Sequence, residues 1–144
     1  MPLHQDLSIP VAERVESIGW QGWSEKEDEL FVQPPVSVLD SVLALRLHLD
    51  DCKERNGALR VVPGSHQLGR LTIAEAIRAK DERGEVCVEI PRGGAMLMKP
   101  LLLHASSKVS IDSVRRVLHF VFAPAELPGG QRWPVRGRSH ASMS

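Results

Sequence analysis

The chain has 144 residues, a length typical of one domain with a buried core. Lysine plus arginine and aspartate plus glutamate number 18 each, so no net charge steers the chain to nucleic acid or an anionic membrane. Two cysteines without metal-type spacing, a start without signal-peptide character and no apolar run of ~20 residues predict a cytoplasmic protein without membrane partners.

The first predicted element is a short strand over residues 3–9, which carries the triplet His4-Gln5-Asp6. In an extended backbone, side chains two positions apart point to the same side. The strand therefore predicts that His4 and Asp6 share one face.

Residues 13–35 are polar and irregular and predict a long loop. A loop of this length in a compact domain is usually functional or mobile. Its Trp20 and Trp23 are therefore candidates for the wall or lid of a pocket, with plain packing of the loop on the body as the alternative.

Residues 38–50 alternate with the period of a strand. One face holds Leu43, Leu45, Leu47 and Leu49, and the other holds Val42, Ala44, Arg46, His48 and Asp50. Asn56-Gly57 predicts a turn, so we expect residues 58–62 to return as the second strand of a hairpin.

The strongest helix signal begins at Thr72, because Thr72 and Glu75 have the spacing of a capping box. Gly84 predicts the end of this helix. Its predicted apolar stripe consists of Ile73, Ala76 and Ile77.

Three further strands are predicted over residues 85–90, 95–103 and 114–123. Many short strands with one short helix and long loops predict a mainly β protein, an antiparallel sandwich or barrel. A jelly roll fits because it brings early and late strands side by side. We expect one domain over residues 1–127 and a disordered tail over residues 128–144, rich in Gly, Pro, Arg and Ser.

In such a fold His4 and Asp6 could meet His104, which follows the strand predicted over residues 95–103. Two imidazoles and one carboxylate suit Fe(II) and leave coordination positions open. A His-X-Asp triplet alone is a weak signal, and a lone histidine is more often structural. A second triplet, His48-Leu49-Asp50, competes for the same role.

Arg115 is the candidate for binding an acidic ligand. On its strand it shares a face with Val117, His119 and Val121, and the opposite face, with Phe120 and Phe122, is expected to pack between sheets. A charged group in a strand is costly unless it is paired, and a 2-oxo acid could supply a bidentate carboxylate. The alternative is that Arg115 and Arg116 are both rim charges.

Several motifs occur in the order seen in one known family: His4-Gln5-Asp6-Leu7, Leu49-Asp50-Asp51, Asn56-Gly57 through Pro63-Gly64-Ser65-His66, His104-Ala105-Ser106-Ser107 and Arg115. Over residues 3–123 the sequence resembles the phytanoyl-CoA dioxygenase family of Fe(II)/2-oxoglutarate oxygenases. The resemblance implies a double-stranded β-helix, a cupin-like jelly roll. It also implies iron held by His4, Asp6 and His104, and 2-oxoglutarate held by Arg115, with Gln5 as a further contact.

The resemblance places His48-Leu49-Asp50 on a structural strand of the family, and Arg46 would be a poor neighbour for a metal dication. His48 is therefore expected to have a structural or pocket-lining role, and Arg46 is a further candidate for the pocket. His119, on the face of Arg115, is a candidate for the cavity, with core packing as the alternative. Family members usually carry a segment before the His-X-Asp triplet, so the domain is expected to be short at its N-terminus.

The implied function is that of a dioxygenase that uses Fe(II), 2-oxoglutarate and O2 to hydroxylate an aliphatic carbon of a small molecule, releasing succinate and CO2. No catalytic residue is expected beyond the metal ligands. One alternative is a weak or inactive jelly-roll domain that binds a small acid or a partner subunit. Another is a cupin-like zinc or nickel isomerase, in which Arg115 would lack a role. A homodimer is a further expectation.

Overall fold

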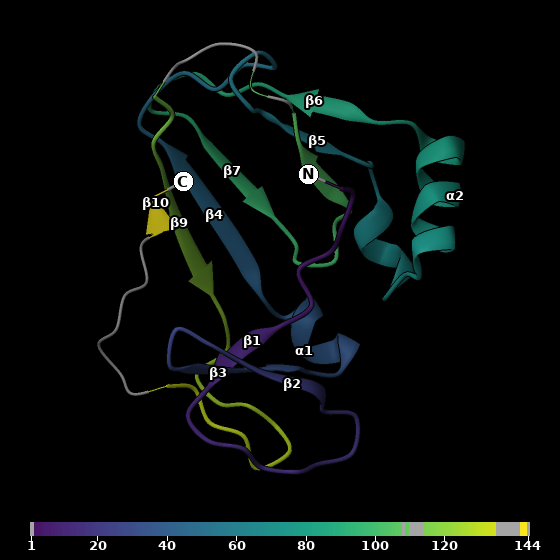
Figure 1. Ribbon diagram of the computed structural model, residues 1–144, viewed down its shortest axis with the longest axis vertical. Helices are drawn as coiled ribbons and strands as arrows, with labels where there is room; N and C mark the ends of the chain where they lie inside the picture. The colour runs from purple at the N-terminus through teal and green to yellow at the C-terminus, as the bar shows by residue number, and fades with distance from the viewer. Residues whose placement is uncertain (1, 108, 110–113, 135–141, 144) are drawn as a thin grey trace.

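The computed structural model describes residues 2–107, 109, 114–134 and 142–143. In chain order the elements are β1 (Ile9–Val11), β2 (Gln21–Lys26), β3 (Glu29–Gln33), α1 (Val36–Asp40), β4 (Leu43–His48), β5 (Leu59–Val61), a 3-10 helix (Ser65–Leu68), α2 (Ile73–Arg83), β6 (Val86–Val88), β7 (Ala95–Met98), β8 (His104–Ser106), β9 (Val117–Phe122) and β10 (Ser142–Met143). The larger sheet has the order β10-β9-β4-β7 and the smaller one β6-β5-β8, while β1-β3-β2 form a third sheet (Figure 1).

The two main sheets pack face to face through a small apolar core. Ala44 and Met98 of the larger sheet contact Leu59 and Val61 of the smaller one. Because alternate side chains of a strand point to opposite faces, the even-numbered residues of β4, among them Arg46, lie on the inner face. The predicted mainly β, double-stranded β-helix with one principal helix is confirmed.

The outer face of the larger sheet is apolar and partly open to solvent. It consists of the odd-numbered residues of β4 and their cross-strand neighbours: Leu43, Leu45, Leu47, Leu97, Leu118, Phe120 and Phe122. Leu97 is 62% exposed and Phe122 is 56% exposed, whereas Val117 on the inner face is fully buried. The expectation that the aromatic face of β9 packs between the sheets is therefore wrong.

The predicted hairpin between residues 38–50 and 58–62 is also wrong. Residues 36–40 form α1, and β5 pairs with β6 and β8 instead of β4. The intervening chain crosses to the smaller sheet, where the backbones of Cys52 and Ile90 exchange two hydrogen bonds of 2.8 and 2.9 Å. Gly57, with φ of +94°, makes the turn that Asn56-Gly57 predicted.

The strand predicted over residues 95–103 is divided between the two sheets. β7 ends at Met98, and β8 begins at His104 in the smaller sheet. Pro100 lies between them and has no N–H to donate to a strand ladder, which favours this break. His104 therefore starts a new strand and does not close the previous one.

The predicted loop over residues 13–35 contains the antiparallel pair β2 and β3. Glu27 and Asp28 connect these strands with positive φ angles of 53° and 61°. A two-residue hairpin turn needs this conformation, but Asn-Gly or Asp-Gly is its usual sequence. The sequence signal for the hairpin was therefore weak. The strand predicted over residues 3–9 is likewise displaced, since β1 covers Ile9–Val11 and pairs with β3.

Part of the predicted disordered tail packs on the body of the protein. The side chain of Gln131 is buried and donates a hydrogen bond of 2.6 Å to the carbonyl of Val15. Trp133 packs against the core of the third sheet. Residues 128–134 thus differ from the expectation, and residues 135–141 and 144 lie outside the described residues.

Helix α2 has the predicted N-terminus, with both hydrogen bonds of the Thr72–Glu75 capping box, and the chain leaves it at Gly84. Its buried residues are Ala76 and Ala79, which pack against Val62 and Leu103. The predicted stripe is correct only for Ala76, because Ile73 is 83% exposed and Ile77 is 55% exposed. No helix of the described ranges has both the length and the apolar character that crossing a bilayer requires.

Replacing Thr72 with alanine is expected to lower the free energy of unfolding by about 1 kcal/mol, because the Glu75 amide loses its side-chain acceptor. Urea unfolding of the metal-free protein measures this loss. Thr72→Ser keeps the hydroxyl and should unfold close to the wild type; an equal loss in both variants would contradict the capping argument.

Candidate metal centre

A single backbone bridge brings the start of the chain to β8. His4 and His104 exchange two backbone hydrogen bonds of 3.0 Å each, and the amide of Asp6 donates to the carbonyl of Pro100 at 2.9 Å. The imidazole rings of the two histidines consequently lie side by side, with centroids 4.3 Å apart. Asp6, two positions after His4, points to the same side.

The three predicted metal ligands come together in the structure. Asp6 Oδ1 lies 3.8 Å from His4 Nε2 and 3.6 Å from His104 Nε2. One donor atom from each of these residues lies within 4.8 Å of the others. His104 is buried, His4 is half-buried and Asp6 is exposed, so the cluster is open on one side.

The hydrogen bonds of the two imidazoles leave the required nitrogen atoms available. His4 Nδ1 lies 3.0 Å from the carbonyl of Pro2, and His104 Nδ1 lies 2.8 Å from the carbonyl of Leu102. A carbonyl can only accept, so each Nδ1 carries a hydrogen, and each Nε2 faces Asp6 and is the nitrogen that could bind a metal. Burial lowers the pKa of His104, which favours the neutral, ligating form. This donor set fits Fe(II) with open coordination positions.

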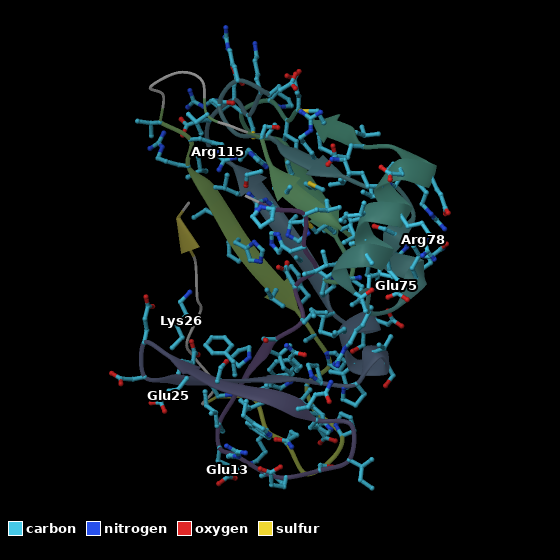
Figure 2. All side chains as sticks on the ribbon, turned by 45° about the vertical axis from the view of Figure 1, so that its right-hand side comes forward. Glu13, Glu25, Lys26, Glu75, Arg78 and Arg115 are labelled. Atoms are coloured by element: carbon cyan, nitrogen blue, oxygen red, sulfur yellow. The ribbon has the colours of Figure 1, made fainter. Side chains whose placement is uncertain are left out.

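The cluster opens into a pocket of about 1990 Å³, which Arg46, Arg115 and His119 also line. Arg115 lies just before β9, at the end of the larger sheet remote from the third sheet (Figure 2). It is half-buried and donates a hydrogen bond from Nη1 to the carbonyl of Gly57. Arg115 therefore lies in the pocket, whereas Arg116 is exposed.

Gln5 lines the pocket and also has a structural role, while its contact with the oxo-acid stays a prediction. Its Nε2 donates to the carbonyls of Gly69 and Leu101, each at 2.8 Å, and its Oε1 accepts from the amide of Leu71 at 2.9 Å. These bonds use both amide hydrogens of the side chain. Gln5 thus fastens the His4–Asp6 segment to two loops of the body.

The competing triplet His48-Leu49-Asp50 has no metal-site geometry. Asp50 accepts three hydrogen bonds of 2.8 to 3.0 Å from Arg116. His48 is 2% exposed, and neither of its ring nitrogens has a hydrogen-bond partner among the described residues. Within those residues, the one cluster that could hold a metal ion is His4, Asp6 and His104.

The hydrogen bonds between Asp50 and Arg116 connect the segment after β4 to the segment before β9. They lower the pKa of Asp50 from 3.8 to about 2. A lowered carboxyl pKa stabilises the fold above the unfolded-state pKa, and this stabilisation is lost as the pH falls. Asp50→Asn should therefore be less stable than the wild type at pH 6, and the difference should shrink between pH 3.8 and pH 2.

Urea unfolding of both proteins across this pH range measures the difference. Asp81→Asn, at an exposed position on α2, is the matched control. A difference that stays constant with pH would contradict the assignment.

Neither predicted tryptophan lines the pocket. Trp20 is 5% exposed in the core of the third sheet, and Trp23 packs on the same core with the Arg14 guanidinium 5.2 Å from its ring centre. Trp133 lines the pocket instead. An aromatic residue is unusual in a disordered tail, and this signal could have identified it.

The other predicted pocket residues lie on the inner face of the larger sheet. Arg46 lies opposite His119 on β9, and both line the pocket, while His48 is buried beyond them. Burial is the main cause that lowers the pKa of all three side chains. The two histidines are therefore neutral near pH 7.

The two facing sheets and the cluster beside β8 define a jelly-roll protein with a two-histidine, one-carboxylate centre. Residues 1–117 match the model of the phytanoyl-CoA dioxygenase (PhyH) family, and the chain belongs to this family. Iron and 2-oxoglutarate are the cofactor and cosubstrate of the family. No curated protein matches the chain.

Similar solved structures include EctD from S. alaskensis with 2-oxoglutarate and 5-hydroxyectoine, at 21% identity and a TM-score of 0.56 over 72% of this chain and 40% of EctD. The non-heme alpha ketoglutarate dependent carbocyclase SnoK from nogalamycin biosynthesis has 17% identity and a TM-score of 0.56 over 94% of this chain and 47% of SnoK. AviO1 from Streptomyces viridochromogenes Tue57 has 24% identity and a TM-score of 0.52 over 85% and 54%. The chain thus spans about half the length of the structures that it matches. EctD has also been crystallised with bound Fe.

Proposed function

We propose that this chain forms the jelly-roll part of an Fe(II)- and 2-oxoglutarate-dependent dioxygenase that hydroxylates an aliphatic carbon of a small organic substrate. The observation that carries the proposal is the convergence of His4, Asp6 and His104 at the wall of a pocket that also contains Arg115. Membership of the PhyH family supports the same activity.

In this proposal His4, Asp6 and His104 hold iron through their Nε2 and carboxylate atoms. When bound, iron and O2 supply the oxidation in which substrate and 2-oxoglutarate give the alcohol, succinate and CO2. The protein contributes positioning: the carbonyl partners of the two imidazoles orient the rings, and the bonds of Gln5 hold the first strand in place.

Arg115 would bind the carboxylate of 2-oxoglutarate that does not coordinate the metal. A guanidinium has five N–H donors, and its bond to the carbonyl of Gly57 leaves donors for a bidentate contact. The Gly57 contact also orients the side chain before the ligand arrives. This reduces the entropy lost on binding.

Anaerobic titration of the purified chain with Fe(II) and then 2-oxoglutarate tests the proposal through the visible charge-transfer band of the chelate. We expect the band, followed by succinate release when O2 is admitted. Oxo-acid binding without succinate would favour the alternative of a catalytically inactive domain that binds a small acid. Absence of both would remove the dioxygenase assignment, and zinc or nickel in the purified protein would favour an isomerase.

We also propose that the chain forms a homodimer through the apolar outer face of the larger sheet. Exposed apolar patches of this kind mark association surfaces. Sedimentation velocity should detect a dimer for the wild type and a monomer for Leu97→Glu. Ile73→Glu, at an exposed apolar position on α2, should remain dimeric; a monomeric wild type at all concentrations would contradict the proposal.

A further inference from the structure

The inner face of β4 places a second guanidinium in the pocket. Arg46 lines the same cavity as the metal cluster and Arg115, and its side chain is half-buried. Its Nε is buried without a hydrogen-bond partner among the described residues. Burial, and after it the charge of Arg115, lowers the pKa of Arg46. The guanidinium nevertheless stays charged, so its charge lies in an unfavourable environment. A half-buried, incompletely paired guanidinium needs an anion to offset its desolvation.

The protein does not supply that anion once iron is bound. The two groups that favour the charged form of Arg46 are Cys52 and Asp6. Cys52 is a buried thiol and not a carboxylate, and in the proposed function Asp6 is a ligand of the metal. The facing residue on β9 is His119, which burial keeps neutral, and the facing residue on β7 is Met96. The charged residues that line the pocket are four basic and two acidic: Lys26, Arg46, Arg115, Arg132, Asp6 and Glu126.

The oxo-acid does not supply the anion either. Of the two carboxylates of 2-oxoglutarate, one would bind the metal and the other Arg115. Arg46 lines the same pocket as the metal cluster and Arg115, so both guanidiniums are open to ligands in that pocket. An anionic group at Arg46 would therefore have to come from the molecule that is oxidised.

Resting on the proposed function, we infer that Arg46 is a specificity residue that binds the carboxylate of the prime substrate, which is an organic acid. Beyond Arg46 the inner face continues with Ala44 and its cross-strand neighbours Met98 and Val121, all of which line the pocket. These side chains offer an apolar surface for the carbon skeleton of the acid. The arrangement predicts recognition of an acid group at one end and an apolar body at the other.

The test begins with the metal-free protein, so that it does not depend on iron chemistry. Hexanoate is the probe, hexanol is its uncharged counterpart, and calorimetry measures binding at constant ionic strength. Arg46→Met should weaken hexanoate binding about tenfold or more, the effect of losing a charge-assisted bidentate contact. Hexanol should bind the wild type and Arg46→Met alike.

Two further variants make the result specific. Arg116→Met removes a guanidinium that is paired with Asp50 and should leave hexanoate binding unchanged. Arg46→Lys keeps the positive charge but loses the two parallel N–H donors of the guanidinium, so it should bind hexanoate more weakly than the wild type. If Arg46→Met does not fold, Arg46→Lys provides the test. Hexanoate binding that is absent, or that survives both Arg46 changes, would overturn the inference.

The second stage uses the anaerobic Fe(II) complex and follows 2-oxoglutarate through its charge-transfer band. The affinity of Arg46→Met for 2-oxoglutarate should stay close to the wild-type value, and saturating 2-oxoglutarate should not displace hexanoate. Equal loss of both ligands would instead place Arg46 in the oxo-acid site and reject the substrate role. A wild type that binds hexanoate but neither iron nor 2-oxoglutarate would reject the proposed function, while the first stage still reports on Arg46.

Discussion

Replacing Asp6 with alanine is expected to lower the affinity for Fe(II) by more than about 100-fold, because loss of groups that merely orient a metal ligand already costs 10- to 100-fold. The carboxylate is the single anionic donor of the cluster, and its Oδ1 faces both imidazole Nε2 atoms. Without it two neutral nitrogen donors remain, a set that holds a hard dication poorly. Calorimetric titration with Fe(II) under anaerobic conditions measures the loss, and succinate release should fall to background.

The matched control is Asp81→Asn, which removes a carboxylate from the exposed side of α2. It should bind iron as the wild type does. Retention of iron by Asp6→Ala would mean that the metal lies elsewhere and would contradict the assignment of the cluster. Urea unfolding of the metal-free variants separates loss of the ligand from loss of the fold.

Replacing Arg115 with methionine is expected to weaken 2-oxoglutarate binding by about 10- to 100-fold, the effect of losing charge-assisted hydrogen bonds to one carboxylate. The affinity for Fe(II) should stay nearly unchanged, because the hydrogen-bond partners of Arg115 among the described residues are Gly57 and Cys52, which are not metal ligands. The charge-transfer titration measures the first quantity and calorimetry the second.

Arg116→Met provides the comparison, since it removes the neighbouring guanidinium, which is exposed and bonded to Asp50. It should leave 2-oxoglutarate binding intact. If Arg115→Met lost iron and 2-oxoglutarate in equal measure, the arginine would have a structural role through Gly57. Arg115→Lys should fall between the wild type and Arg115→Met, because a lysine keeps the charge and loses the bidentate geometry.

Features that depend on local sequence were predictable. The capping box of α2 is one example, since Thr72 and Glu75 contact each other within a single turn. The alternation along β4 is another, because residues at even and odd positions of a strand necessarily separate onto two faces. The mainly β fold and the family are confirmed, while the ligand set and the role of Arg115 remain predictions that the variants test.

Features that depend on distant packing were not predictable. The β2–β3 hairpin was missed because its turn uses Glu27 and Asp28 at positive φ in place of a glycine. The partner of β5 was wrong because turn residues indicate that the chain reverses and carry no information about which sheet it enters. The structural role of Gln5 was not predicted, because the three backbone groups that its side chain contacts belong to loops distant in the sequence.

The sequence alone determined which chemical groups are available: two imidazoles and one carboxylate in a suitable order, followed by Arg115. The tertiary structure decided that these groups meet, because the backbone bridge between His4 and His104 joins segments from opposite ends of the domain. It also decided that Asp50 pairs with Arg116 and that Arg46 faces the pocket. The physical reason is that a strand fixes the direction of its own side chains, whereas the pairing of strands fixes what those side chains face.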